Sequence, residues 1–361
     1  MPDESLRRWL GALDAEGVTD LHLKPGSPPK VRCKGALEPI PDEAALTRAD
    51  VDAAVAVALP NGDDARSLGM DGLGRFRVRA QRQRGSTVLV IRRIPDRVPS
   101  LAELHLPEAV ATFTEPDRGL VLVGGPPRSG RRSTLASLLD HVNRTRAVHL
   151  VAVERPVEVL HRDVVASVSQ IEVGVDSPSF ADGVRAAIAL DGDVVVVSDV
   201  DDAATVEAVL EAVEEGALVL AGMDGDGADD LLRRFVDLLP EERREPARIA
   251  LAGCLVGTTS QRLAARAGDT GRVPVVEVVR ATPRVREALL DADTVGAVPS
   301  LAEVRIVDAV ADLYRRGVLD LRGAMAVTDD WSVLREVLQP SAPPPELPAL
   351  PRRVPGAQLP G

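Results

Sequence analysis

Four short apolar segments beyond residue 119 constrain the fold of this chain more than any other feature of its sequence. Each is long enough for one strand, and stretches with helical patterning separate them along the chain. Segments this apolar are typical of strands buried on both faces of a parallel sheet, with helices packed against those faces. The pattern therefore predicts an α/β fold with strands at Leu120–Val123, Leu150–Val153, Val194–Val197 and Ala217–Ala221.

The first hundred residues show a different pattern. Apolar side chains recur at helical spacing over about the first fifteen residues, and a second short helix is expected at Arg48–Ala58. Alternating segments bounded by turn residues predict strands as well. We therefore expect a small α+β domain, with strands at Asp20–Lys24, Val31–Cys33, Gly74–Arg84 and Thr87–Arg93.

Proline positions and composition divide the chain into three parts. Pro95 and Pro99 mark the end of the first domain, which we place at residues 1–99. The second domain, residues 100–338, is expected to end in a helical part whose clearest helix is Leu301–Arg316. Eight of the last 22 residues are prolines, so residues 339–361 are predicted to be a disordered tail.

The charge balance excludes several classes of function. The chain has 43 Lys and Arg against 55 Asp and Glu, a net charge of −12, which argues against a general binder of nucleic acid or anionic membranes. Its two cysteines lie far apart, so neither a disulfide framework nor a zinc site is indicated. No apolar run approaches the roughly 18–20 residues that span a bilayer. We expect a cytoplasmic protein without membrane insertion.

A glycine-rich turn follows the first of the four apolar segments and leads into an apolar helix. This strand–turn–helix order is the context that a phosphate-binding loop requires. In the pattern G-x-x-x-x-G-K-[ST], Gly125 and Gly130 have the correct spacing, but Arg131 stands at the lysine position and Arg132 at the Ser/Thr position. Taken alone, the segment leaves open nucleotide binding or an ordinary Gly/Pro turn.

Several collinear motifs show a resemblance to a known family. The chain resembles the type IV pilus retraction ATPase (PilT) family of the type II/IV secretion ATPases over about residues 5–338. The motifs that carry the resemblance are Val18–Pro29, Gly74–Val78, Arg82–Gly85, Arg92–Pro95, Ser260–Leu263, Gly271–Glu277 and Thr282–Arg286. The resemblance implies a hexameric motor subunit with a PAS-like N-terminal domain and a RecA-like P-loop domain. It also implies ATP and Mg²⁺ as ligands and a pilus platform protein of the inner membrane as partner, with peripheral attachment to that membrane through the pilus machine.

The same resemblance assigns roles to individual residues. Glu154 corresponds to the glutamate of the family's acidic box, and Asp199 to the catalytic glutamate that follows an apolar strand. Ser133 and Asp193 correspond to residues near the metal. Arginines of the strand–turn region are expected to reach a neighbouring subunit's nucleotide, although a solvated strand face also explains them; they are Arg75, Arg77, Arg82 and Arg84. The nucleotide-binding residues would be Gly125, Ser129, Gly130, Arg131, Arg132, Ser133 and Thr134.

The chain departs from the family at each chemically demanding position. Arg132 cannot coordinate Mg²⁺ because a guanidinium has donors and no acceptor, so only a one-residue slip could bring Ser133 to the metal. Arg155 replaces the aspartate of the acidic box, and Met223–Asp226 replaces a histidine-containing box. Arg128 stands where the family usually has glycine, so a positive φ there would cost ~1 kcal/mol. The aspartates that follow Met223 could form a hard-metal site, but an acidic loop at a helix start explains them more simply.

These substitutions leave three interpretations. The first, which we favour, is a pseudo-ATPase partner or modulator that retains the fold and subunit interfaces and joins homo- or hetero-hexamers with PilT-family subunits. The second is an active hexameric pilus-retraction ATPase or a type II secretion-type ATPase. The third is a sensor that binds nucleotide without hydrolysing it.

Overall fold

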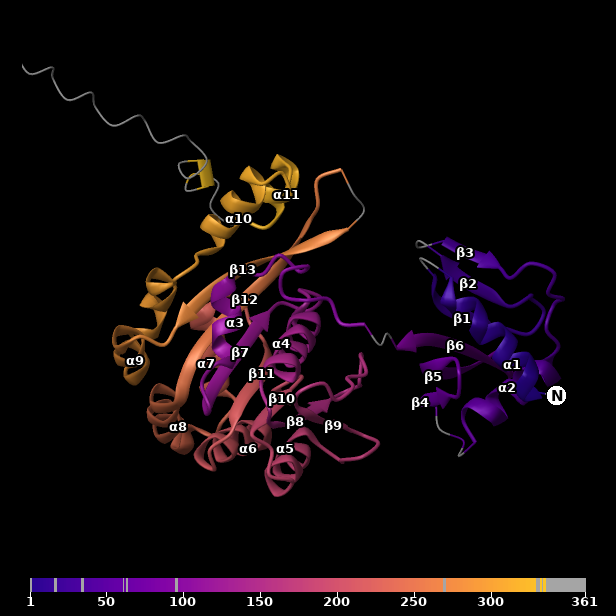
Figure 1. The fold of residues 1–361 in the computed structure, drawn as a ribbon, viewed down its shortest axis with the longest axis horizontal. Helices are drawn as coiled ribbons and strands as arrows, with labels where there is room; N and C mark the ends of the chain where they lie inside the picture. Colours follow the sequence, from indigo (N-terminus) through magenta and orange to yellow (C-terminus); the bar gives the residue numbers. More distant parts are fainter. Residues whose placement is uncertain are drawn as a thin grey trace, which may run out of the picture.

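The fold was determined as a computed structural model, which describes residues 2–15, 18–33, 36–60, 62, 64–94, 97–268, 271–328, 332 and 334–335 (Figure 1). The predicted proline-rich tail, residues 339–361, lies outside these residues. Within the described part of the chain, no helix is both long and apolar enough to cross a membrane.

The N-terminal unit is built on a six-stranded antiparallel sheet with the order β3-β2-β1-β6-β5-β4. Helices α1 (Pro2–Gly11) and α2 (Arg48–Ala58) pack against each other and share one apolar core with the sheet. The α2 helix, expected at Arg48–Ala58, begins at a capping box in which the side chains of Thr47 and Asp50 accept hydrogen bonds from each other's backbone N–H groups. The strands are β1 (Val18–Leu23), β2 (Lys30–Cys33), β3 (Ala36–Pro39), β4 (Ala65–Met70), β5 (Gly74–Gln83) and β6 (Ser86–Ile94).

A second, seven-stranded sheet has the order β13-β12-β7-β11-β10-β8-β9. All neighbouring strands are parallel except β13, which runs antiparallel to β12. The four apolar segments predicted as strands are its centre, β7, β8, β10 and β11. The strands are β7 (Gly119–Gly125), β8 (His149–Glu154), β9 (Ser167–Glu172), β10 (Val194–Val197), β11 (Leu218–Asp224), β12 (Leu255–Ala265) and β13 (Arg272–Arg280).

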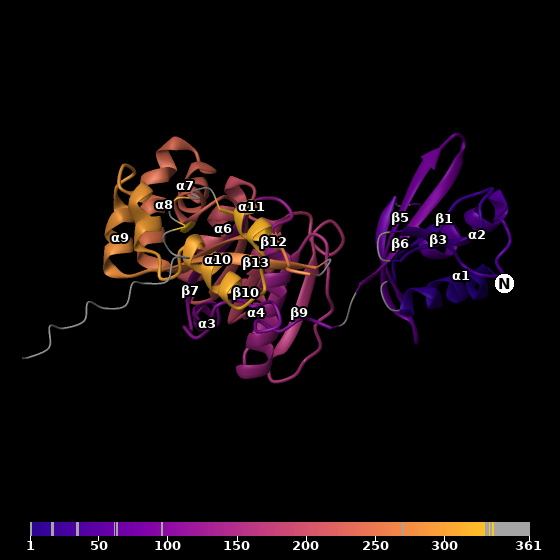
Figure 2. The same cartoon turned by 90° about the horizontal axis from the view of Figure 1, so that it is seen from above.

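Helices cover both faces of this second sheet, as the apolar strands predicted. Alternate residues of β7 face two different cores: Leu120 and Leu122 pack with α5, α6, α7 and α8, whereas Val121 and Val123 pack with α4. In Figure 2 the second sheet and its helices form one unit, and the strands of the first sheet lie in another. The helices are α3 (Glu108–Ala111), α4 (Arg131–Thr145), α5 (Phe180–Ala189), α6 (Ala203–Glu214), α7 (Ala228–Asp237), α8 (Glu241–Cys254) and α9 (Pro283–Leu290), with a 3₁₀ turn at Thr112–Thr114.

The C-terminal helices pack on the β12–β13 hairpin. Helices α10 (Ile306–Arg315) and α11 (Leu321–Ala326) form a small core with Val273 and Val275 of β13. The helix predicted at Leu301–Arg316 corresponds to α10, because the residues before it form the 3₁₀ segment Val295–Leu301.

The direction of the parallel strands positions the site. Strands β7, β8, β10 and β11 all end at the same edge of the sheet, where ligands bind in open α/β folds. The residues at or just beyond these strand ends are Gly125, Glu154, Asp199 and Asp224.

Candidate functional site

The loop between β7 and α4 has a backbone shape that glycine makes possible. Gly125 has a φ of +146°, and a Cβ at this position would lie 2.3 Å from the carbonyl oxygen of Gln261 and 2.4 Å from the Ser129 hydroxyl. Gly130 has a φ of +92°. Arg128 also adopts a positive φ, +68°, which confirms the conformation expected there. The loop therefore keeps its turn although the residues around the turn have changed.

The first turn of α4 presents free backbone N–H groups to the loop. The helix begins at Arg131, and Gly130 as its N-cap residue supplies no side-chain cap. Gln261 of β12 fixes the loop to the helix, since its amide donates to the Ser129 carbonyl at 2.8 Å and accepts from the Thr134 hydroxyl at 2.8 Å. Thr134 is therefore turned toward β12 and away from the loop opening.

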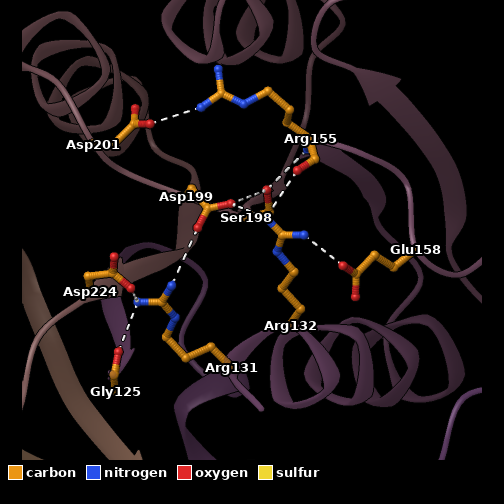
Figure 3. Close-up of polar contacts among 9 residues, drawn as sticks. All are labelled: Gly125, Arg131, Arg132, Arg155, Glu158, Ser198, Asp199, Asp201 and Asp224. Atoms are coloured by element: carbon orange, nitrogen blue, oxygen red, sulfur yellow. Dashed lines mark hydrogen bonds and ion pairs between the residues drawn. The ribbon is translucent and has the colours of Figure 1, made fainter. Parts of the chain in front are cut away.

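Arg131, at the position of the phosphate-binding lysine, is held by the chain itself. Its guanidinium donates to the Gly125 carbonyl at 3.0 Å, forms an ion pair with Asp224, and lies 3.5 Å from Asp199 (Figure 3). Only 11% of the Arg131 side chain is exposed. The guanidinium thus lies across the opening of the loop and joins the ends of two adjacent strands, β7 and β11.

Arg132, at the position of the metal-binding hydroxyl, is also paired. Its guanidinium donates to Asp199 at 2.9 Å, to Glu158 at 2.6 Å and to the carbonyl of Arg155 at 3.0 Å. Burial opposes the charge of Arg132, but Glu158 and Asp199 outweigh it and raise the pKa of the guanidinium above its ordinary value. Arg132 is therefore a fixed cation at this site.

Arg155, which replaces the acidic-box aspartate, forms a third pair. Its guanidinium lies 2.9 Å from Asp201 and stacks over the ring of Phe180, 4.7 Å from the ring centroid. Its backbone N–H donates to the Ser198 hydroxyl at 3.2 Å, and that hydroxyl donates to Asp199 at 3.2 Å. Figure 3 shows the polar contacts of Arg131, Arg132 and Arg155 as one connected group around Asp199.

Glu154 lies beside this group at the end of β8. Its carboxylate accepts a hydrogen bond from the Gln170 side chain at 2.8 Å. Burial raises the pKa of Glu154 to about 7, and the hydrogen bond from Gln170 opposes the shift only in part. Near neutral pH a substantial fraction of Glu154 is therefore protonated and lacks the permanent negative charge that a metal-associated carboxylate needs.

The structure brings most of the predicted loop residues together with Asp199, but two predicted metal residues are not placed for that role. Ser133 is exposed one helical position beyond Arg132. Because α4 begins at Arg131, directly after Gly130, the helix is not shifted by the one residue that would bring Ser133 to the position of Arg132. Asp193 precedes β10 and accepts a hydrogen bond from the His149 backbone at 2.8 Å, at the opposite edge of the sheet from the loop. Asp193 was matched by its sequence motif alone. Strand β10 (Val194–Val197) separates it from Asp199, so the two aspartates lie at opposite ends of that strand.

The predicted arginines of the first unit lie on β5 and its turn. Arg75, Arg77 and Arg79 share one strand face, because Phe76 and Val78 point into the core. Arg82 and Arg84 continue toward the turn and are exposed. Their reach into a neighbouring subunit stays a prediction.

Three of the four aspartates that follow Met223, Asp224, Asp226 and Asp230, are engaged in ion pairs. Asp226 accepts two hydrogen bonds from Arg262, at 3.0 and 2.8 Å, and Asp230 accepts from Arg234 at 2.9 Å. Over the described ranges, no group of three or more His, Cys, Asp or Glu side chains is arranged to hold a metal ion. Asp226 and Asp230 are thus engaged by arginines of the same chain at the start of α7.

The residues at the loop do not fit a magnesium ion. Mg²⁺ requires oxygen ligands in octahedral geometry, and Arg132 offers none where a hydroxyl is needed. The carboxylate that could approach the ion, Asp199, is 20% exposed and already accepts hydrogen bonds from Arg132 and Ser198.

The counter-ions Glu158 and Asp201 were not predicted from the sequence. The available signal was that each added arginine, once buried, requires an acidic partner.

A glycine-rich strand–turn–helix loop at the carboxyl edge of a RecA-like sheet, preceded by a smaller α+β unit, defines the P-loop ATPase class of fold. Residues 76–297 match the family described as type II/IV secretion system protein, and the chain belongs to this family. It is 33% identical to the type IV pilus ATPase PilT of Pseudomonas aeruginosa over 284 residues, 76% of this chain and 82% of that protein. It is 26% identical to the type IV pilus ATPase PilU of the same organism over 351 residues, 92% of this chain and 91% of that protein.

A solved structure agrees with this assignment. The crystal structure of the pilus retraction motor PilT with bound ADP superposes with a TM-score of 0.83 at 33% identity, covering 92% of this chain and 98% of that chain.

Proposed function

We propose that the chain is a subunit of a type IV pilus motor of the PilT and PilU kind that hydrolyses ATP weakly or not at all. It would act as a pseudo-ATPase partner or modulator of an intact motor subunit. Its similarity to both pilus ATPases over most of its length supports the motor role.

The observation that carries the loss of catalysis is the position of Arg132. Phosphoryl transfer in P-loop ATPases needs a hydroxyl on Mg²⁺ and a carboxylate that orients water. Arg132 replaces that hydroxyl, and its guanidinium lies 2.9 Å from Asp199, the carboxylate expected to take the second role. One substitution thus affects both requirements.

The unpaired arginines of β5 and of the turn that follows it support assembly with other subunits. In the part of the chain that the structure describes, Arg75, Arg77, Arg82 and Arg84 have no side-chain ion pair, whereas Arg131, Arg132 and Arg155 are all paired. A terminal nitrogen of Arg77 is buried without a hydrogen-bond partner, and burial lowers the pKa of this arginine although Glu158 and Glu172 oppose the shift. These side chains suit an anionic partner, such as a nucleotide bound to a neighbouring subunit in a homo- or hetero-hexamer. We also propose that the N-terminal unit is PAS-like.

A second candidate is nucleotide binding without turnover. The loop retains the positive φ values at Gly125 and Gly130 and the free N–H groups at the start of α4, which together can hold a phosphate. This candidate predicts a measurable affinity for ADP or ATP and no phosphate release.

Phosphate release from Mg-ATP tests the proposal, with P. aeruginosa PilT as the intact comparison. We expect turnover at least about a hundredfold slower than that of PilT, because transition-state contacts are missing. A rate like that of PilT that disappears in Asp199→Ala would overturn the pseudo-ATPase assignment. Native mass spectrometry after coexpression with an intact subunit of the family tests the partner role, and a failure to form mixed rings would contradict it.

A further inference from the structure

Three carboxylates around the loop, Asp199, Asp224 and Glu158, are partnered by arginines of the same chain. Asp224 pairs with Arg131, and Asp199 pairs with both Arg131 and Arg132. Glu158 pairs with Arg132. The residues at the positions of the family's catalytic groups therefore carry opposite charges that pair with one another. Independent loss of each motif would not produce this pairing.

These ion pairs connect the loop and the strand ends at the place where a bound ligand would contact both. Arg131 connects the start of α4 with the carbonyl of Gly125 at the end of β7 and with Asp224 at the end of β11. Arg132 connects the same helix turn with Asp199, just after β10, and with Glu158 beyond β8. The two guanidiniums occupy the space between the loop and the sheet edge.

The charges of this arrangement disfavour both natural ligands. Counting Arg155 and Asp201 with the others, three arginines face four carboxylates, which gives 3 − 4, or one net negative charge. A polyanionic nucleotide would have to displace carboxylates from Arg131 and Arg132 to reach the loop. A divalent cation would find its carboxylate ligands already paired.

We infer that Arg131, Arg132, Asp199, Asp224 and Glu158 form a closing network that keeps the loop shut to nucleotide and to magnesium. This inference rests on the proposed function and goes beyond it, because it assigns a role to Asp224. Asp224 is a positioning residue: it holds the cation of residue 131 away from a phosphate. Restoring the family's lysine and serine alone leaves Asp224 in place to hold the new lysine.

Equilibrium binding of a fluorescent ADP with Mg²⁺ tests the network in the full chain. The variants are Arg131→Lys with Arg132→Ser, and the same pair with Asp224→Asn. We expect no binding by the wild type or the double variant, and at least tenfold tighter binding by the triple variant. Arg144→Ser is a matched control, since it removes an exposed ion pair with Asp140 on the same helix; we expect it to bind no nucleotide.

Two outcomes overturn the inference. Equal binding by the double and triple variants would show that Asp224 does not close the site, while the pseudo-ATPase proposal would stand. Binding of the fluorescent ADP by the wild type would show that the network does not shut the loop to nucleotide. By contrast, turnover of Mg-ATP by the wild type contradicts the proposed function itself, so the two failures are distinguishable.

A stability cycle keeps the inference testable if the triple variant folds poorly. The cycle compares melting temperatures of the wild type, Arg131→Met, Asp224→Asn and the variant with both changes. A closing network predicts that the double change lowers the melting temperature by less than the sum of the single changes. Additive losses would overturn the pairing on which the inference depends.

Discussion

The guanidinium of Arg132 lies 2.9 Å from the carboxylate of Asp199 and links the first turn of α4 to the end of β10. Both side chains are more than half buried, with 37% and 20% exposure. In such a setting, removal of one partner leaves a charge that neither water nor the protein fully compensates. The pair therefore stabilises the fold at the place where an active ATPase would hold a metal.

Arg132→Ala should lower the free energy of unfolding by about 1–2 kcal/mol, because Asp199 and Glu158 both lose their guanidinium partner. Urea unfolding followed by circular dichroism measures this loss. The control is Arg144→Ala, which removes an i,i+4 pair between a solvent-exposed arginine and Asp140 on the same helix and should lose less stability than Arg132→Ala. Equal losses in the two variants would contradict a special role for Arg132.

Arg128→Gly should stabilise the chain by about 0.5–1 kcal/mol. Arg128 has a φ of +68°, a conformation that is strained for a residue with a Cβ and free for glycine. The melting temperature should rise by a few degrees at most. Arg79→Gly is the control: Arg79 lies within β5, where glycine weakens the strand, so the same change should lower the melting temperature. A fall in both variants would show that the loop does not store strain at Arg128.

The central strands could be predicted from the sequence because their apolar runs are continuous. Strands β3 and β9 were missed, since β3 is exposed along its whole length at a sheet edge and β9 has only two apolar residues, Val168 and Ile171, without regular alternation. Strand β12 was missed for another reason: Thr258, Thr259, Ser260 and Gln261 interrupt its apolar pattern although all four are buried. Their polarity is explained in part by Gln261, which supports the loop through its amide.

The loop could also be predicted, but its counter-ions could not. The spacing of Gly125 and Gly130 is local, so the sequence displays it directly. Asp224 is far from Arg131 in the chain and reaches it only because β11 lies beside β7 in the sheet. By motif alone, Asp224 marks only the absence of the family's histidine box. In the structure it forms an ion pair with Arg131, which stands at the lysine position of the loop.

Gly125→Ala should disrupt the loop and cost several kcal/mol. The added Cβ would lie 2.3 Å from a backbone oxygen of β12, which cannot move without shifting the strand. Gly216→Ala is the matched control, because Gly216 also has a positive φ, +108°, but no atom lies within 4 Å of the added Cβ. The control should lose only about 1 kcal/mol from backbone strain. Thermal unfolding distinguishes the two, and similar losses would mean that the close approach at Gly125 is relaxed in solution.

Glu154→Gln should change the pH dependence of stability. Burial raises the pKa of Glu154 to about 7 from an ordinary value of 4.5, so the folded state favours the protonated carboxyl. The stability that this group contributes is therefore complete below about pH 4.5 and is lost as the pH rises through 7. Glutamine cannot ionise and still offers an oxygen to the Gln170 side chain, so the variant avoids this loss.

Compared with the wild type, the glutamine variant should gain ~2 kcal/mol at pH 8, a value reduced from the full shift because the side chain is partly exposed. The gain should shrink toward zero at pH 5, where the wild-type carboxyl is also protonated. Chemical unfolding of both proteins at pH 5, 6.5 and 8 measures the difference. A constant difference across that range would show that Glu154 does not titrate there, and a loss of stability at pH 8 would show that its negative charge is used in the folded state.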